Sequence, residues 1–487
     1  MSFGDFIKRE GDLLIYGPNE YGGLAGKPFR AMGVNYSHYA RAGMLRNVSK
    51  EGETHYPLND EGEVDDLMDT LELLGAGALR FYTVCYRKPG DEDGAPRFFK
   101  APGVPNEMVF EWFRRFLDKC EEKNVRVIVV LTCQYGFFGG IPEQVAYRYP
   151  DRYHPVGRVV PGEWEEWGER LEKIVNPLFY TDRRIIDDFK ACISTLIDWY
   201  GEHKAVMAWE TGNELRDVPV SWTNEITGFI KQKDPNHLIM DGHWNNEFSG
   251  APGMDPSSLD CPHVDIVQTH FYPWVIPQEE WNGVLDRNLD GAKGRKAYMV
   301  GEFGFGEGGH MGDFMRYVAE SRAVGALVWD LVPHQRAGGF IQENYSSQGV
   351  CEWRGYRYPG FPSGGGFWEA EVLDHLRNSA YKVKGVIVPS KPAPKPPLLL
   401  PIIESAAINW RGSAGTETYD VYRARSAEGP WELIGADARD SWDVKTPDQT
   451  CCFSDTETKQ GVKYYYRVTA KNASGVSDPS NIVESGL

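Results

Sequence analysis

Two glutamates follow apolar segments that are typical of buried strands, and their carboxyl groups are suited to acid–base catalysis. Glu214 closes the segment AVMAWETGNE directly after Asn213, and Glu302 lies in KAYMVGEFGFG. Two carboxyls that face each other can cleave a glycosidic bond, because one protonates the leaving oxygen while the other attacks the anomeric carbon or activates water. The pair therefore indicates glycosidic bond cleavage if the fold brings both side chains to one place.

The elements that must position this pair alternate along the chain. Eight short runs of β-branched and aliphatic residues lie at 29–36, 78–84, 125–132, 205–210, 237–242, 264–271, 296–303 and 325–332. Longer amphipathic stretches separate them, as at 63–77, 108–124 and 185–203. This α/β pattern predicts a (β/α)8 TIM barrel with enlarged loops, whose active site forms where the strands end. A doubly wound sheet is the alternative, but no GxGxxG or GxxxxGK[ST] opens a helix.

A proline-rich segment divides the chain. VIVPSKPAPKPPLLLP favours an extended, semi-rigid spacer. We expect a catalytic barrel domain over 1–385, a linker over 386–401 and a small all-β sandwich over 402–487, where short alternating strands are bounded by Gly, Asn, Ser and Pro.

Composition narrows the classes of partner. The 487 residues include 52 Lys and Arg against 70 Asp and Glu, for a net charge of −18, which argues against nucleic-acid binding. No apolar run has the ~20 residues that cross a membrane. Aromatic residues make up 13%, which suits stacking on sugar rings. We therefore expect a β-linked polysaccharide or oligosaccharide as the partner.

Other features of the sequence imply no cofactor and do not assign a cellular location. No Cys or His cluster has zinc or calcium spacing, and hydrolysis through two carboxyls needs only water, so we expect no cofactor and no metal. The eight cysteines are expected to be mostly buried free thiols. The N-terminus lacks the order of a signal peptide. Localisation stays unassigned: secreted if a signal was removed, otherwise cytoplasmic.

Several longer motifs resemble one family. Residues 179–214, the phrase DPNHLIMDG and the phrase THFYP are similar to the retaining glycoside hydrolases of clan A, family 5, and AWE-x-x-NE is similar to the endo-β-mannanase subfamily. The string YYYRVTAKNASGVSDPS, with Trp410 at the core tryptophan position, resembles a fibronectin type III domain. The first resemblance implies a (β/α)8 barrel that acts on β-mannan-type substrates.

The family resemblance implies roles for matching residues. Glu214 would be the general acid/base and Glu302 the nucleophile, with Asn213 hydrogen-bonded to the sugar 2-OH and Arg80 holding the nucleophile ionised. His270 and Tyr272 would line the site. The remaining candidates for substrate binding are Trp329, as a flat floor under the sugar, and Asn35, Tyr36 and His38 after the first strand.

The two carboxyls need different protonation states. Arg80 is expected to lower the pKa of Glu302, while the negative charge of Glu302 raises the pKa of Glu214. Glu214 then serves as acid and later as base, which predicts retention of configuration and a carboxyl separation of about 5–5.5 Å.

Departures from the subfamily leave alternatives open. NELRD lacks the proline that usually follows NE, and the loops over 139–177 and after the eighth strand match nothing familiar. These loops decide whether the cleft is open at both ends, so an endo-acting hydrolase, an exo-β-mannosidase or β-glucosidase, and a transglycosylase all fit the same catalytic pair. A non-catalytic carbohydrate-binding barrel is the remote alternative.

Overall fold

The structure is a computed structural model in which residues 4–18, 23–36, 58–83, 97–134, 139–152, 171–244, 254–340, 355–359, 368–403, 407–440 and 451–485 are described. Eight parallel strands close into a barrel in the order β10-β11-β12-β3-β4-β7-β8-β9. They are β3 (Ala31–Tyr36), β4 (Ala78–Tyr82), β7 (Arg126–Val130), β8 (Val206–Glu210), β9 (Leu238–Met240), β10 (Ile266–Phe271), β11 (Ala297–Phe303) and β12 (Gly325–Val328). Each overlaps a predicted strand, so the predicted barrel is confirmed.

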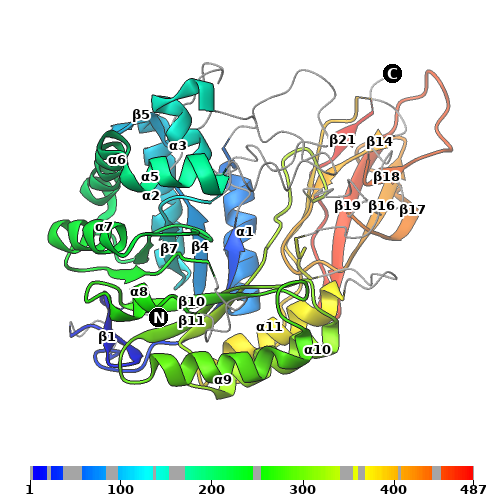
Figure 1. The fold of residues 1–487 in the computed structure, drawn as a ribbon. Helices are drawn as coiled ribbons and strands as arrows, with labels where there is room; N and C mark the ends of the chain where they lie inside the picture. The colour runs from blue at the N-terminus through cyan, green and yellow to red at the C-terminus, as the bar shows by residue number, and fades with distance from the viewer. Residues whose placement is uncertain are drawn as a thin grey trace.

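Helices surround the barrel (Figure 1). They are α1 (Glu61–Leu74), α2 (Glu107–Glu122), α3 (Ile141–Arg148), α5 (Asn176–Thr181), α6 (Arg183–Tyr200), α7 (Val220–Lys233), α8 (Pro256–Asp260), α9 (Trp281–Ala292), α10 (Gly308–Glu320) and α11 (Glu369–Val383). Helix α1 shows why a helix begins and ends where it does. Asp60 and Glu63 form a capping box at its start, and Gly75 closes it in the left-handed conformation (φ 68°).

Two apolar cores hold the barrel. The larger lies between the strands and the helices, and the smaller fills the barrel interior with residues such as Ala78, Ile128 and Met240. A hairpin of β1 (Ile7–Glu10) and β2 (Leu13–Tyr16) contributes Ile7 and Leu14 to that interior core. The barrel is therefore packed solid at its N-terminal part, which leaves the C-terminal ends of the strands for chemistry.

The C-terminal part consists of antiparallel strands that lie to one side of the barrel (Figure 1). Its main sheet contains β16 (Thr418–Ala424), β17 (Glu432–Ala438), β19 (Tyr465–Asn472), β20 (Gly475–Val476) and β21 (Val483–Glu484). Two short pairs complete it: β13 (Leu398–Leu399) with β15 (Trp410–Arg411), and β14 (Ala407–Ile408) with β18 (Phe453–Ser454). These strands share one core around the fully buried Trp410.

The proline-rich segment contacts both parts of the chain. Arg377 of α11 donates to the Pro389 carbonyl at 2.5 Å, and Asn472 of β19 donates to the Pro392 carbonyl at 2.8 Å. A buried histidine in the loop after β12 also joins the two parts, with His334 Nδ1 2.7 Å from Asp66 Oδ2 of α1 and Nε2 3.0 Å from Asp440 Oδ2. Carbonyls of this expected spacer therefore accept hydrogen bonds from both parts, while most of its residues are exposed.

Two further observations concern membrane-spanning helices and cysteines. Within the described ranges, no helix has the length and apolarity that crossing a membrane requires. Six described cysteines are not in disulfide bonds, namely Cys120, Cys133, Cys192, Cys261, Cys451 and Cys452.

Candidate active site

The two glutamates meet at the C-terminal ends of the strands, with a histidine between them. Glu302 ends β11 and is paired in register with His270 of β10. The His270 Nδ1 atom lies 2.7 Å from Glu214 Oε1 and 3.3 Å from Glu302 Oε2. One carboxylate oxygen of each glutamate and a ring nitrogen of His270 all lie within 4.8 Å of one another. Two carboxyls this close fit direct attack by one of them on a sugar carbon, with no room for a water between.

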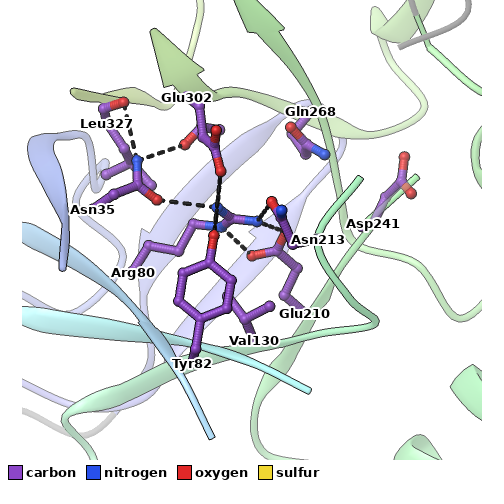
Figure 2. Close-up of polar contacts among 12 residues, drawn as sticks. Asn35, Arg80, Tyr82, Val130, Glu210, Asn213, Asp241, Gln268, Glu302 and Leu327 are labelled. Carbon is purple, nitrogen blue, oxygen red and sulfur yellow. Dashed lines mark hydrogen bonds and ion pairs between the residues drawn. The ribbon is translucent and has the colours of Figure 1, made fainter. Parts of the chain in front are cut away.

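Glu302 is held by several donors. The Arg80 guanidinium donates through Nη1 to Oε1 at 2.5 Å, and the Tyr272 hydroxyl donates to Oε2 at 2.6 Å. The Tyr82 hydroxyl lies 3.3 Å from Oε1 (Figure 2). The carboxyl is 3% exposed, so these hydrogen bonds fix its direction in a site with little water.

Arg80 lies fully buried beneath the site and is anchored by a residue that the sequence did not single out. Its Nε and Nη2 atoms donate to the two oxygens of Glu210, both at 2.6 Å. Nη2 also donates to Asn213 Oδ1 at 2.9 Å, and Nη1 donates to Asn35 Oδ1 at 3.0 Å (Figure 2). The signal that could have identified Glu210 is its position at the end of the apolar run AVMAWE, because a carboxylate that is buried there needs a cation as partner.

Burial sets the proton affinities of the site. Desolvation raises the pKa of Glu302 above its usual value, and the opposing charges of His270 and Arg80 and the hydrogen bond from Tyr272 only reduce that rise. The expected lowering by Arg80 is thus outweighed by burial. Burial also lowers the pKa of His270 to about 4, so this imidazole is neutral near pH 7. A neutral His270 with its proton on Nδ1 can donate to these carboxyl oxygens without adding a charge.

The backbone of Glu214 is unusual. Its φ is 53°, in the left-handed region that costs a residue with a Cβ atom roughly 1–2 kcal/mol. Asn213 before it continues the barrel pattern by bridging to Cys133, which follows β7. Strain of this kind is found where surrounding contacts over-determine a functional residue.

The structure places the other predicted residues in different surroundings. Asn35 lies in the barrel interior, but its amide donates to the carbonyls of Gly301 and Leu327, so it is a support for Arg80. Tyr36 does not face the site: its hydroxyl donates to Asn59 Oδ1 at 2.6 Å and its ring stacks on Phe116 of α2. Consecutive strand residues point to opposite sides, so only one of the two could face inward.

Two predicted residues remain. Trp329 is half-buried at the strand ends, packed against Tyr82, Val130 and Cys133, with its ring edge-on to Tyr82. This position suits a floor under a sugar ring. His38 lies outside the described residues.

An aromatic group beside Glu302 was also not singled out from the sequence. The Tyr272 ring stacks on Trp274 with centroids 4.7 Å apart at 9°, and Phe305 lies 6.0 Å from Tyr272. Trp274 is 47% exposed. Its nearness to the site depends on the turn after β10, although Trp274 directly follows THFYP in the sequence.

The same three side chains have the spacing of a metal site. Glu214, Glu302 and His270 each offer one ligand atom within the 4.8 Å limit. However, Arg80 donates directly to Glu302, so a cation there would be placed against a guanidinium. The arrangement fits proton transfer and nucleophilic attack better than metal binding.

Comparisons with known proteins identify the family of this chain. The family model described as "GH family 5 beta-mannosidase-like" matches residues 13–288, more than half of the chain. A probable mannan endo-1,4-beta-mannosidase F of Aspergillus oryzae is 23% identical over 388 residues, 70% of this chain and 74% of the relative. A putative mannan endo-1,4-beta-mannosidase 4 of Arabidopsis thaliana is 23% identical over 389 residues, 67% of this chain and 83% of the relative.

Solved structures share the fold. A glycoside hydrolase family 5 mannosidase from Rhizomucor miehei has a TM-score of 0.56 at 19% identity, over 79% of this chain and 99% of its own. The endo-beta-1,4-mannanase from Thermotoga petrophila has a TM-score of 0.53 at 18% identity, over 95% of this chain and 99% of its own. Together with the family match, the barrel and its paired carboxyls show that this chain belongs to glycoside hydrolase family 5.

Proposed function

We propose that the protein hydrolyses β-mannosidic bonds in mannan-type polysaccharides or oligosaccharides with retention of configuration. The observation that carries this proposal is the close approach of Glu214 and Glu302, which offer oxygens within 4.8 Å of each other. Retaining enzymes bring their carboxyls to about 5–5.5 Å, whereas inverting enzymes hold them further apart. The curated relatives, named as mannan endo-1,4-beta-mannosidases, support the substrate class.

In the first step, Glu302 attacks the anomeric carbon and Glu214 protonates the leaving oxygen. The Tyr272 and Arg80 hydrogen bonds hold Glu302 with one oxygen aimed at the sugar. Asn213 accepts from Arg80 through Oδ1 and donates through its amide nitrogen to Cys133 Sγ at 3.5 Å, and in this proposal the same amide nitrogen donates to the sugar 2-OH. A covalent glycosyl-enzyme results.

In the second step, the charge on Glu302 is gone because its oxygen is esterified. Glu214, now a carboxylate, takes a proton from water, and that water attacks the anomeric carbon to release the sugar. His270, 2.7 Å from Glu214, keeps this carboxyl in place through both steps.

Replacing each carboxyl by its amide tests the mechanism. We expect Glu302→Gln to lose at least roughly 10⁴-fold in kcat on mannan oligosaccharides, because the covalent step is removed. Glu214→Gln should lose far less on an aryl glycoside whose leaving group needs no proton. Proton NMR of the first product gives the stereochemistry, and an inverted product would disprove the double displacement.

The same proposal covers the mode of attack. The curated relatives are named as endo-acting enzymes, so we expect early oligosaccharide ladders from β-mannan, glucomannan or both. Release of mannose alone would instead identify an exo-β-mannosidase, and transfer products would identify a transglycosylase. Xylan and β-glucan serve as control substrates.

We also propose a domain organisation. The catalytic barrel covers 1–385, the proline-rich segment 386–401, and a fibronectin type III-like sandwich 402–487. The common core around Trp410 supports one compact β unit. Limited proteolysis followed by mass spectrometry tests these boundaries, and stable fragments that end within the β unit would contradict them.

A further inference from the structure

The peptide segment that carries Glu214 is held from two sides. The strained residue lies between Asn213 and Leu215, and each of these residues is bonded to a neighbouring strand end. Asn213 N–H donates to the Thr132 carbonyl at 2.8 Å, and Leu215 N–H donates to the Gly242 carbonyl at 2.9 Å. These contacts fix the segment as a whole.

One residue, Gln134, bonds the segment on both sides of Glu214. Its backbone N–H donates to the Asn213 carbonyl at 2.9 Å. Its side-chain Oε1 accepts the backbone N–H of Arg216 at 2.9 Å. Gln134 therefore spans the left-handed residue, and it is itself 1% exposed.

The orientation of the Gln134 amide follows from its partners. A backbone N–H can only donate, so the atom that faces Arg216 is the oxygen Oε1. Nε2 is then the donor to Asn176 Oδ1 at 2.8 Å, at the first residue of α5. Asn176 Nδ2 is buried with no hydrogen-bond partner among the described residues. The side chain of Gln134 thus connects α5 to the segment that carries Glu214 through two hydrogen bonds.

We propose that Gln134 is a positioning residue for proton transfer by Glu214, an inference that rests on the proposed function. The left-handed backbone of Glu214 aims its carboxyl, and Gln134 supplies hydrogen bonds that hold this conformation. Proton transfer requires the donor within hydrogen-bond reach of the glycosidic oxygen, so a small displacement costs rate. The nucleophile is held separately by Arg80 and Tyr272.

Because different residues hold Glu214 and Glu302, the loss of Gln134 should have a distinct kinetic effect. Loss of Gln134 should impair protonation of the leaving group and leave nucleophilic attack nearly intact. The test is Gln134→Leu, which keeps the volume and removes both side-chain hydrogen bonds. The substrates are phenyl β-mannobioside, whose leaving group needs a proton, and 2,4-dinitrophenyl β-mannobioside, whose leaving group does not.

We expect kcat/KM to fall about 10–100-fold on the phenyl substrate and less than about threefold on the dinitrophenyl substrate. Equal losses on both substrates would overturn the inference. Gln134→Glu should restore the activity, because its carboxyl accepts from Arg216 and Asn176 can turn its amide to donate. A loss in Gln134→Glu as large as in Gln134→Leu would also overturn it.

Gln144, a second buried glutamine near the strand ends, provides a matched control. Gln144 of α3 is equally buried, and its Nε2 atom donates to Thr132 Oγ1 at 2.8 Å and to the Gly139 carbonyl at 3.1 Å. Gln144→Leu should show no dependence on the leaving group, and the same dependence as Gln134→Leu would refute the specific role. If Gln134→Leu does not fold, Asn176→Leu removes only the hydrogen bond between Gln134 Nε2 and Asn176 Oδ1. This variant should give a smaller loss of kcat/KM that is confined to the phenyl substrate.

Glu214→Gln separates this inference from the proposed function. A steep dependence on the leaving group in Glu214→Gln, without one in Gln134→Leu, refutes the role of Gln134 alone. If Glu214→Gln itself shows no such dependence, the assignment of Glu214 as the acid fails.

Discussion

Arg80 and Glu210 form a fully buried two-pronged ion pair, with Nε and Nη2 of the guanidinium each 2.6 Å from one carboxylate oxygen. Arg80 lies on β4 and Glu210 on β8, so the pair crosses the barrel interior. Because Arg80 also donates to Glu302, its position determines where the nucleophile lies. Burial raises the pKa of Glu210 to about 7, even against the charge of Arg80.

Glu210→Ala should destabilise the fold and abolish most activity. Removing Glu210 breaks a buried ion pair and deprives the Nε atom of Arg80 of its carboxylate partner, although Glu302 still faces the guanidinium, and such a loss costs ~3–5 kcal/mol in the free energy of unfolding. Urea unfolding followed by fluorescence measures the loss. Glu107→Ala, which breaks the exposed pair with Lys100, is the control and should leave the urea midpoint unchanged. Equal midpoints for Glu210→Ala and the unmodified protein would contradict the assigned importance of the pair.

Tyr272→Phe should move the acid limb of the pH profile of kcat/KM to higher pH. The Tyr272 hydrogen bond lowers the pKa of Glu302, so its loss raises that pKa and fewer molecules carry the nucleophile as a carboxylate at acid pH. A hydrogen bond to a charged group contributes ~1.5–3 kcal/mol, which corresponds to a shift of about one pH unit or more. Tyr200→Phe, whose hydroxyl bonds the Phe110 carbonyl on α2, should leave the profile unchanged. An unmoved acid limb in Tyr272→Phe would show that another group sets it.

Trp274→Ala should weaken substrate binding more than it slows the chemical step. An exposed indole that stacks on Tyr272 offers an apolar face next to the site, and stacking on a ring of that size contributes ~1 kcal/mol or more. We expect KM for mannan oligosaccharides to rise about 5–10-fold, with kcat within about twofold. Trp431→Ala, in the C-terminal sheets, is the control. An unchanged KM in Trp274→Ala would place the sugar elsewhere.

His334→Gln should reveal a stability difference that depends on pH. Asp66 and Asp440 raise the pKa of His334 to about 10, against an opposing effect of burial. A raised pKa stabilises the folded state fully below the unfolded value of 6.5, and this contribution declines until about pH 10. The difference in unfolding free energy between the unmodified protein and His334→Gln should therefore be largest near pH 6, at roughly 3 kcal/mol, and shrink toward pH 10. A constant difference across this range would mean that the histidine does not titrate there.

The barrel and its catalytic pair were predictable because both depend on local pattern. Apolar runs that alternate with amphipathic stretches fix the strand ends, and Glu214 and Glu302 each follow such a run. The partner of Arg80 was not predictable from spacing, since Arg80 and Glu210 meet across the barrel and not along one element. The period of two along a strand could have separated Asn35 from Tyr36, because only one neighbour can point inward.

Other features depend on contacts between distant parts of the chain. The net pKa of Glu302 depends on how much water the fold removes, which no sequence spacing reveals. The proline-rich segment looked like a spacer because its composition favours extended chain, yet carbonyls along it accept hydrogen bonds from Arg377 and Asn472. Trp274 lies close to Tyr272 only because the chain turns after β10.

The link from Asp66 through His334 to Asp440 has a practical consequence for anyone who shortens this enzyme. A catalytic fragment that stops before the C-terminal strands would lose Asp440 and leave the buried imidazole of His334 with Asp66 as its carboxylate partner. A useful truncation would therefore have to redesign Asp66 and His334 together.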